Sequence, residues 1–459
     1  MRLGRLLVSL LMLCGIGAAQ IRGVNLWVFT PPTSSSAALT SAYNVAAGAV
    51  VSIPWSGDIN PSKGGWETST SSGCGYTGMC PVAYSFTNFD NAISQQLGFG
   101  AKKVRVILSA VAFGGSNSST PSYIFDSAYA AHNSYTQQFT CADTDYAGSG
   151  AITLGQCAQG VDNTAAPIYW LTTEPFRPRW IAAVVAAVNH IAGCTVGTCG
   201  YGPSQIDSVR PGGGAGGEWF PWGTSALVFQ VYGAVNGTTL ATFKTDWMAY
   251  VTAMETTVNA ASSGLRFIQS QNGGVNGGSA QGATPIPYSW ADNEASIANA
   301  NGWGHGDQGL TGNWNPGGSV CPAGNQGVAS GNNADIIRFA NHGYNSGGNN
   351  TFTYPSFDGP YVFHTYPSDR PLELQTGGGG ASDPTGQCSP GSLVLIVPYA
   401  ILQVKATDLE LYWQDWQVAF DSGNANYAKY HVEYQQVLAG NWATGPSGSF
   451  IMSGSSIMQ

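Results

Sequence analysis

Strand-like and helix-like segments alternate along most of this chain, and this alternation limits its possible folds more than any other feature. Short apolar runs at 21–29, 103–108 and 265–271 have the composition of buried strands. The Ala- and Val-rich segment Arg179–Ile191 has the pattern of a helix that is buried on most faces. Strands and helices that alternate in one continuous run indicate a parallel sheet with helical crossovers. The sequence therefore predicts an α/β fold.

The length of the chain favours one form of such a sheet. The chain has 459 residues, and long Gly-, Ser-, Asn- and Thr-rich loops follow the expected strands. A (β/α)8 barrel carries long loops at the carboxyl ends of its strands, so it fits better than a doubly wound sheet. No Gly-x-Gly-x-x-Gly lies between a strand and a helix, so no dinucleotide site is indicated. We expect residues 20–459 to form one (β/α)8 TIM-barrel domain.

The N-terminus has the pattern of a secretory signal peptide. Arg2 and Arg5 give it a positive charge, Leu6–Cys14 is apolar, and small residues end it at Gly17–Ala19. The apolar run is too short to span a bilayer comfortably. We therefore expect residues 1–19 to be removed and the protein to be secreted, either extracellular or periplasmic, without membrane attachment.

The remaining cysteines are even in number and lie mostly in near pairs, which predicts disulfides in an exported protein. No two Cys-x-x-Cys pairs occur, and no histidines stand at the usual zinc-ligand spacing, so disulfides are favoured over zinc. Eight cysteines allow about 105 pairings. The expected bonds, which would staple the long loops, are Cys74–Cys80, Cys141–Cys157, Cys194–Cys199 and Cys321–Cys388.

Charge is scarce in this chain. Only 9% of the residues are charged, the net charge is −9, and no basic cluster occurs, which argues against nucleic acid and anionic membranes as partners. No Gly-x-Ser-x-Gly, His-Glu-x-x-His or phosphate-loop motif is present. We expect a monomer that acts on a carbohydrate, with no cofactor and no metal.

A single carboxylate stands out at the end of one expected strand. Glu218 follows the glycine-rich segment Pro211–Gly217 and precedes Trp219-Phe-Pro-Trp222. Glycines allow another molecule to approach the backbone closely, and tryptophan rings offer flat apolar surfaces on which sugar rings can stack. Glu218 is therefore a candidate catalytic or sugar-binding acid, although it could also cap a helix that begins near Trp222.

Hydrolysis of a glycosidic bond needs a second carboxylate across the bond from the first. Glu373 and Glu410 each lie in a Leu-Glu-Leu sequence with the pattern of a strand. Glu373 could instead be an ion-pair partner of Arg370. The spacing does not separate Glu373 from Glu410, and both stay as candidate partners of Glu218.

These segments together resemble a known family. The Gly-Gly-Glu-Trp segment at 216–219 and the strand-borne Glu373 look like the clan A-like (β/α)8 glycoside hydrolases, whose catalytic glutamates lie on strands four and seven. Gly217 stands where the family usually has Asn, as in secreted members with a Gly-Glu variant of the motif. Leu409–Trp413 is similar to the family's eighth-strand segment. The resemblance implies that Glu218 is the general acid/base and Glu373 the nucleophile.

We therefore expect a secreted glycoside hydrolase that cleaves O-glycosidic bonds in a neutral poly- or oligosaccharide with two carboxylates, with retention. The alternative is a barrel that binds carbohydrate at the cell surface or in the matrix without cutting it. The expected substrate-binding residues are aromatic or hydrogen-bonding groups near strand ends: Asn25, Trp27, Trp219, Trp222, Gln271, Asn272, Trp303, His305, Tyr366, Glu410 and Trp413.

Overall fold

The structure is a computed structural model, and it describes the strands of the central sheet and the helices named below. The described residues are 24–58, 61–69, 82–111, 119–121, 138–140, 165–167, 176–215, 240–261, 264–272, 294, 297–298, 300–310, 372–376, 393, 397, 408–440, 442–444 and 450–452.

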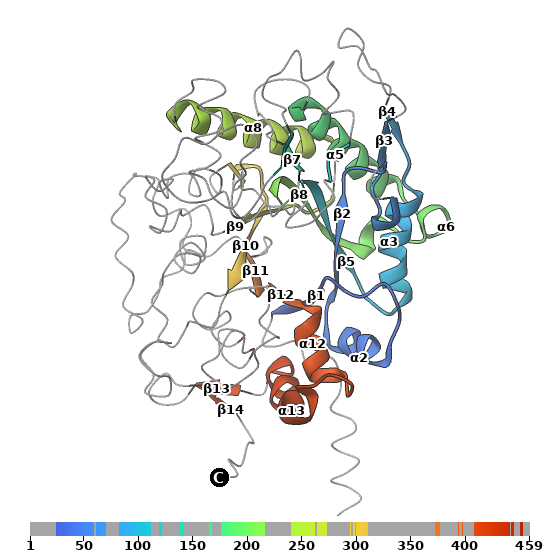
Figure 1. Ribbon diagram of the computed structural model, residues 1–459, viewed down its shortest axis with the longest axis vertical. Helices are drawn as coiled ribbons and strands as arrows, with labels where there is room; N and C mark the ends of the chain where they lie inside the picture. Colours follow the sequence, from blue (N-terminus) through green and yellow to red (C-terminus); the bar gives the residue numbers. More distant parts are fainter. Residues whose placement is uncertain are drawn as a thin grey trace, which may run out of the picture.

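A parallel sheet of eight strands forms the centre of the protein (Figure 1). Its strands are β1 (Asn25–Phe29), β2 (Gly48–Pro54), β5 (Val104–Val111), β8 (Ile206–Ala215), β9 (Ile268–Asn272), β10 (Gly304–Leu310), β11 (Leu372–Thr376) and β12 (Asp408–Tyr412). They lie in the order β8-β5-β2-β1-β12-β11-β10-β9, and every neighbouring pair is parallel. The α/β class expected from the sequence is confirmed.

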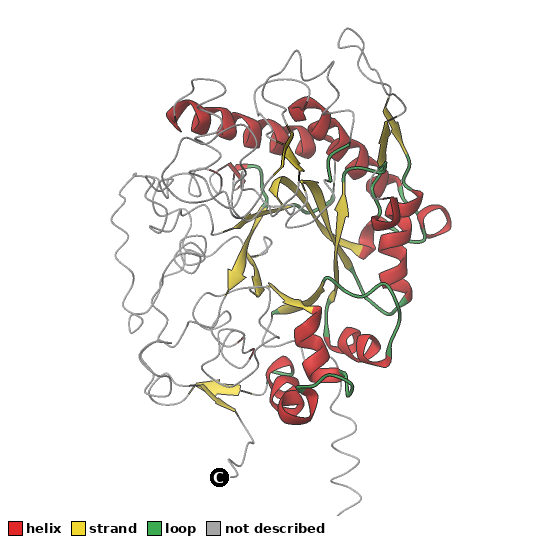
Figure 2. Ribbon diagram, in the orientation of Figure 1, coloured by secondary structure: helices red, strands yellow, loops and turns green. Residues whose placement is uncertain are grey.

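The two edge strands of this sheet approach each other. Val209 of β8 forms a parallel bridge with Phe267, directly before β9, and its amide donates to the carbonyl of Arg266 at 2.9 Å. Figure 2 shows the strands curving around a common centre, with described helices on the outside. Hydrogen-bonded neighbours in this sheet are strands that follow one another along the chain, and the last strand, β12, pairs with the first, β1. The bridge between Val209 and Phe267 links β8 to the start of β9, the next strand of the sheet along the chain.

Described helices follow β1, β2, β5, β8 and β12 and lie on the outer side of the sheet (Figure 1). They are α2 (Ala37–Val45), α3 (Thr87–Gly98), α5 (Phe176–Gly193), α6 (Val196–Cys199), α8 (Leu240–Ala261), α12 (Trp413–Phe420) and α13 (Tyr427–Leu438), with short 3-10 turns at Pro61–Lys63 and Pro203–Gln205. Three small antiparallel pairs lie outside the main sheet: β3 (Glu67–Ser69) with β4 (Val82–Tyr84), β6 (Gln138–Thr140) with β7 (Ala165–Pro167), and β13 (Trp442–Thr444) with β14 (Phe450–Met452).

Side-chain alternation separates the two faces of the sheet. In β1, Leu26 and Val28 belong to the large core that the sheet forms with the helices. Trp27 and Phe29 belong to a separate small cluster with Val50 and Ile107. Because successive side chains of a strand point to opposite faces, these two clusters identify a helix-covered outer face and an enclosed inner face.

One of the four expected disulfides lies within the described residues. The Cys194–Cys199 disulfide is present, with the two Cα atoms 5.6 Å apart. Cys74, Cys80, Cys141, Cys157, Cys321 and Cys388 lie outside the described residues. Within the part of the chain that the structure describes, no helix combines the length and the hydropathy needed to cross a membrane.

A buried carboxyl group lies between α8 and the outer face of the sheet. Glu255 of α8 is fully buried and accepts hydrogen bonds from Gln269 Nε2 at 3.0 Å and Asn301 Nδ2 at 3.2 Å. Burial raises the pKa of Glu255 well above its usual value, and the nearby carboxyl of Glu294 adds to this, while the two amide hydrogen bonds oppose it. The group therefore favours its protonated form in the folded protein.

The raised pKa of Glu255 predicts a pH-dependent stability. A carboxyl with a higher pKa in the folded than in the unfolded state stabilises the fold below its unfolded pKa of about 4.3, and this contribution is lost as pH rises through the folded pKa. We expect the unfolding free energy of the parent to fall relative to that of Glu255→Gln as pH rises from about 4, by up to about 1.4 kcal/mol per pH unit. Urea unfolding at several pH values measures this difference, and a difference that does not change with pH would contradict it.

Candidate functional site

A network of buried charges occupies the inner face of the sheet, and Arg105 of β5 is at its centre. Its Nε lies 2.9 Å from Asp207 Oδ2 of β8, and its Nη2 lies 2.6 Å from Asp408 Oδ1 of β12. All three side chains are less than a tenth exposed. Arg105 therefore bridges two carboxylates that would otherwise be buried at high cost.

The first strand completes this part of the network. Trp27 Nε1 donates to Asp408 Oδ1 at 3.0 Å, and Asn25 Nδ2 donates to the same oxygen at 3.2 Å. The guanidinium of Arg105 lies 4.0 Å from the centre of the Trp27 ring, a cation–π arrangement. Trp27 thus serves the network with both its N–H group and its ring face.

A second ion pair lies beside the first. Arg210 Nη2 of β8 is 2.7 Å from Glu410 Oε1 of β12, and Arg105 Nη1 is 3.8 Å from the same oxygen. Glu410 is fully buried, and its Oε2 has no hydrogen-bond partner among the described residues. The two arginines and three acids therefore form one continuous group of charges.

These contacts require a strongly curved sheet. β5 and β12 are three strands apart, and β8 and β12 are four apart. In a flat sheet, with neighbouring strands about 4.8 Å apart, these separations would be about 14 Å and 19 Å. The ion pairs of Arg105 and Arg210 with β12 therefore span the inside of a sheet that curves back on itself.

The pKa values of Asp207 and Glu410 are shifted in opposite directions. Burial raises the pKa of Asp207, but the charge of Arg105, with those of Arg266 and Lys103, outweighs it and holds that pKa below its usual value. Burial also raises the pKa of Glu410, and here Arg210 and Arg105 do not fully offset it. The charges that surround Asp207 therefore lower its pKa, whereas the complete burial of Glu410 raises its pKa even though both arginines are close to it.

Aromatic rings lie at the carboxyl ends of β1 and β12. Phe29 and Tyr412 end these strands, and their ring centres are 4.8 Å apart in an edge-to-face arrangement. The next residue after β1, Thr30, has φ 51° and is exposed. A left-handed conformation in a β-branched residue stores strain, and such strain is concentrated at functional sites.

The two expected catalytic residues are placed by the order of the strands. In chain order, β8 is the fourth strand of the main sheet and β11 is the seventh. Glu218 lies outside the described residues, and two glycines separate it from the end of β8 at Ala215. Glu373 is the second residue of β11 and pairs in register with Asp408; its side chain lies outside the described residues.

Three expected substrate-binding residues, Asn25, Trp27 and Glu410, belong to the inner network. Trp303 does not lie with them. It precedes β10, is buried in the large core, stacks on Phe267 with ring centres 5.0 Å apart, and donates to Asn259 Oδ1 of α8. Trp303 therefore packs the outer face of the sheet against α8.

The other expected binding residues are described only in part. Trp413 begins α12 directly after β12 and packs, half-buried, against the large core. Gln271 and Asn272 end β9, whereas His305 is the second residue of β10, away from its carboxyl end; the side chains of these three residues lie outside the described residues. Trp219, Trp222 and Tyr366 also lie outside the described residues.

Four members of the network were not anticipated: Arg105, Asp207, Arg210 and Asp408. Their signal is a charge within an apolar strand pattern, as in Lys103–Ile107 and Asp408–Leu411. A charged residue flanked by buried aliphatic residues at alternate positions faces the other side of the sheet from them. When several strands carry such charges of opposite sign, an enclosed polar network is the arrangement that satisfies them.

Comparison with known proteins gives no assignment. No protein-family model matches this chain, and no curated protein matches it significantly.

Proposed function

We propose that the protein is a secreted (β/α)8 glycoside hydrolase that cleaves a neutral poly- or oligosaccharide. The observation that carries this proposal is the strand order. Glu218 follows the fourth strand of the parallel sheet, and Glu373 lies on the seventh. In the (β/α)8 glycoside hydrolases that the sequence resembles, strands four and seven carry the catalytic glutamates, so this strand order supports assigning those roles to Glu218 and Glu373.

A complete barrel is part of the proposal. It is supported by the parallel pairing of all eight strands, the bridge between β8 and β9, and the ion pairs that cross the inner face from β5 and β8 to β12. A buried layer of side chains inside the sheet also fits, because the interior of a (β/α)8 barrel is packed and is not a pore.

The proposed mechanism uses the two carboxylates in different roles. Glu218, protonated, gives its proton to the leaving glycosidic oxygen while Glu373 attacks the anomeric carbon. Glu218 then removes a proton from water, which releases the sugar from Glu373. Such a retaining mechanism places the two carboxyl groups about 5–5.5 Å apart, whereas an inverting one needs about 6.5–9.5 Å.

The buried network favours Glu373 over Glu410 as the nucleophile. Glu410 is fully buried, and its Oε1 lies within 4 Å of both Arg210 and Arg105. A carboxylate that is held by two guanidinium groups is a poor nucleophile and a good anchor. We infer that Glu410 is a positioning residue that holds Arg210 on the inner face of the sheet.

The test separates these two glutamates. In a retaining enzyme, removal of the nucleophile side chain leaves a space in which azide can attack the anomeric carbon in its place. We expect Glu373→Gly to lose activity on an activated aryl glycoside and to regain part of it with azide, forming a glycosyl azide. Glu410→Gly should not be rescued by azide, and its main effect should be a lower unfolding free energy.

Other outcomes of this experiment are equally informative. Rescue of Glu410→Gly instead of Glu373→Gly would exchange the two roles and leave the reaction class unchanged. Full activity in both variants would contradict the two-carboxylate mechanism. A parent protein that binds polysaccharide but cleaves none would support the alternative, a non-catalytic carbohydrate-binding barrel.

A further inference from the structure

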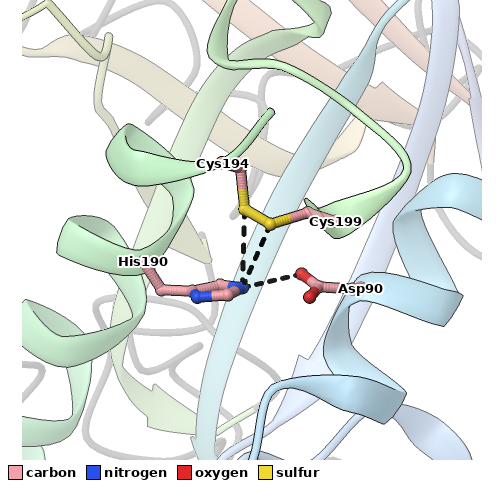
Figure 3. Close-up of side chains that lie close together, drawn as sticks. All are labelled: Asp90, His190, Cys194 and Cys199. Carbon is pink, nitrogen blue, oxygen red and sulfur yellow. Dashed lines mark hydrogen bonds and ion pairs between the residues drawn. A yellow bond between two sulfur atoms is a disulfide. The ribbon is translucent and has the colours of Figure 1, made fainter. Parts of the chain in front are cut away.

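A second group of reactive side chains lies far from the inner network, where α3, α5 and α6 meet (Figure 3). Asp90 comes from α3, His190 from the last turn of α5, and Cys194 and Cys199 from the end of α5 and from α6. The proposed catalysis uses none of these four residues. Their side chains point toward one another, and dashed lines join one imidazole nitrogen of His190 to both sulfurs and to the carboxylate of Asp90 (Figure 3).

The four side chains offer the atoms that zinc prefers. His190 Nε2 lies 2.8 Å from Asp90 Oδ1, 3.5 Å from Cys194 Sγ and 3.8 Å from Cys199 Sγ. All four potential ligand atoms lie within 4.8 Å of one another. Two thiolates, one imidazole and one carboxylate are all zinc ligands, and four of them complete a tetrahedral site.

The distances are close to those of a tetrahedral site. With Zn–S bonds of about 2.3 Å and Zn–N bonds of about 2.0–2.1 Å, a nitrogen and a sulfur ligand are about 3.6 Å apart, and two sulfurs about 3.8 Å apart. The distances from His190 Nε2 to Cys194 Sγ and Cys199 Sγ, 3.5 Å and 3.8 Å, are already close to this nitrogen–sulfur separation. Reduction of the disulfide would allow the two sulfurs to separate to about 3.8 Å. The distance between His190 Nε2 and Asp90 Oδ1 would need to grow by only about 0.6 Å.

Neighbouring residues orient the imidazole and the carboxylate. The Phe86 ring stacks on His190 with ring centres 3.9 Å apart, and the Tyr201 hydroxyl donates to Asp90 Oδ1 at 2.8 Å. Such partners hold ligands in place at metal sites. The His190 and Asp90 side chains are 22% and 15% exposed, so an ion can reach them from solvent, whereas the two cysteines are buried.

We propose that the dithiol form of this cluster binds one Zn²⁺ ion through Cys194, Cys199, His190 and Asp90, and that the disulfide excludes it. On binding, the two thiols lose their protons and each sulfur gives an electron pair to the metal. Oxidation by an organic disulfide forms the Cys194–Cys199 bond, transfers two electrons to the reagent, which takes up two protons as two thiols, and releases Zn²⁺. The cluster is thus a redox-dependent metal site.

His190 is the histidine nearest to this cysteine pair in the sequence. His190 stands four residues before Cys194, one helical turn away on α5, and Asp90 comes from a helix a hundred residues earlier in the chain. Only the packing of α3 against α5 and α6 brings this carboxylate to the sulfurs. A ligand set shared between distant helices has no fixed spacing for a sequence pattern to detect.

The test uses the full chain, reduced with a phosphine that does not chelate zinc, and measures bound Zn²⁺ by equilibrium dialysis. Because other cysteines are also reduced, the parent is compared with a Cys194→Ser/Cys199→Ser variant. We expect the parent to bind one more equivalent than this variant, and oxidised glutathione to release that equivalent. With Co²⁺ in place of Zn²⁺, the thiolate-to-metal absorption of the double cysteine variant should be lower than that of the parent by the contribution of one site.

Two histidine variants make the test specific. His190→Gln should weaken the affinity for the additional equivalent at least about tenfold. His431→Gln is the matched control, because His431 is also half-buried and stacked on an aromatic ring, that of Tyr427, with ring centres 4.2 Å apart. Circular dichroism and thermal unfolding check that each variant folds, and Asp90→Asn gives a second ligand variant.

Equal zinc binding by the parent and the double cysteine variant, or equal affinity in both histidine variants, would overturn the proposal.

Discussion

Glu218→Gln should lower kcat/KM on the best polysaccharide substrate by about 10²–10⁴-fold, the range expected when a general acid/base is removed. Gln is similar in size and shape to Glu but cannot give up a proton to the leaving oxygen. The loss should be largest for substrates with poor leaving groups, because an activated aryl leaving group needs little protonation. Steady-state kinetics on a natural and an aryl substrate measures both effects.

The pH profile gives this prediction a second readout. A protonated Glu218 near neutral pH requires a raised pKa, which burial against the neighbouring tryptophans and the negative charge of Glu373 would supply. The alkaline limb of the parent's kcat/KM profile should then be absent from Glu218→Gln. Glu433→Gln is the matched control, because Glu433 is exposed on α13. An unchanged profile and rate in Glu218→Gln would exclude this residue as the acid.

Arg105→Ala should destabilise the fold by about 3–5 kcal/mol, because it removes the buried cation that bridges two buried acids. Asp207 and Asp408 would each lose a short charge-assisted hydrogen bond, and Trp27 would lose the cation above its ring. Water cannot easily replace the guanidinium, since the side chains are almost fully buried. Urea unfolding, with its slope compared between variants, gives the free energy.

Arg266→Ala is the control for this effect. Arg266 also contacts Asp207, at 3.4 Å, but its side chain is 47% exposed. Exposed ion pairs contribute about 0–1 kcal/mol, so its loss should be small. If Arg105→Ala were no more destabilising than Arg266→Ala, the inner network would not be a major source of stability.

The fold class could be predicted from the sequence because most strands and helices carry strong local patterns. The expected strands at 21–29, 103–108 and 265–271 overlap β1, β5 and β9, and the expected helix Arg179–Ile191 lies within α5. α2, β2 and α12 were not anticipated. β2 begins with Gly48 and ends with Pro54, and its apolar run shows no alternation that would distinguish a strand from a buried loop.

The candidate site could be predicted only in part, for a physical reason. The carboxylates after the fourth strand and on the seventh are visible as local motifs, so Glu218 and Glu373 could be selected from sequence. The network around Arg105 depends on contacts between residues far apart in the sequence, such as Arg105 and Asp408, which are 303 positions apart. Those contacts exist only because the sheet curves, and curvature has no local sequence signal. The role of Glu410 as an arginine partner follows from the same curvature.

The most direct test of the proposed function is the release of reducing sugar from a panel of neutral polysaccharides by the mature, oxidised protein. We expect release from at least one polysaccharide, and loss of that release in Glu218→Gln prepared in the same way. No release from any member of the panel, together with retained binding to one of them, would contradict the hydrolase and favour a carbohydrate-binding barrel.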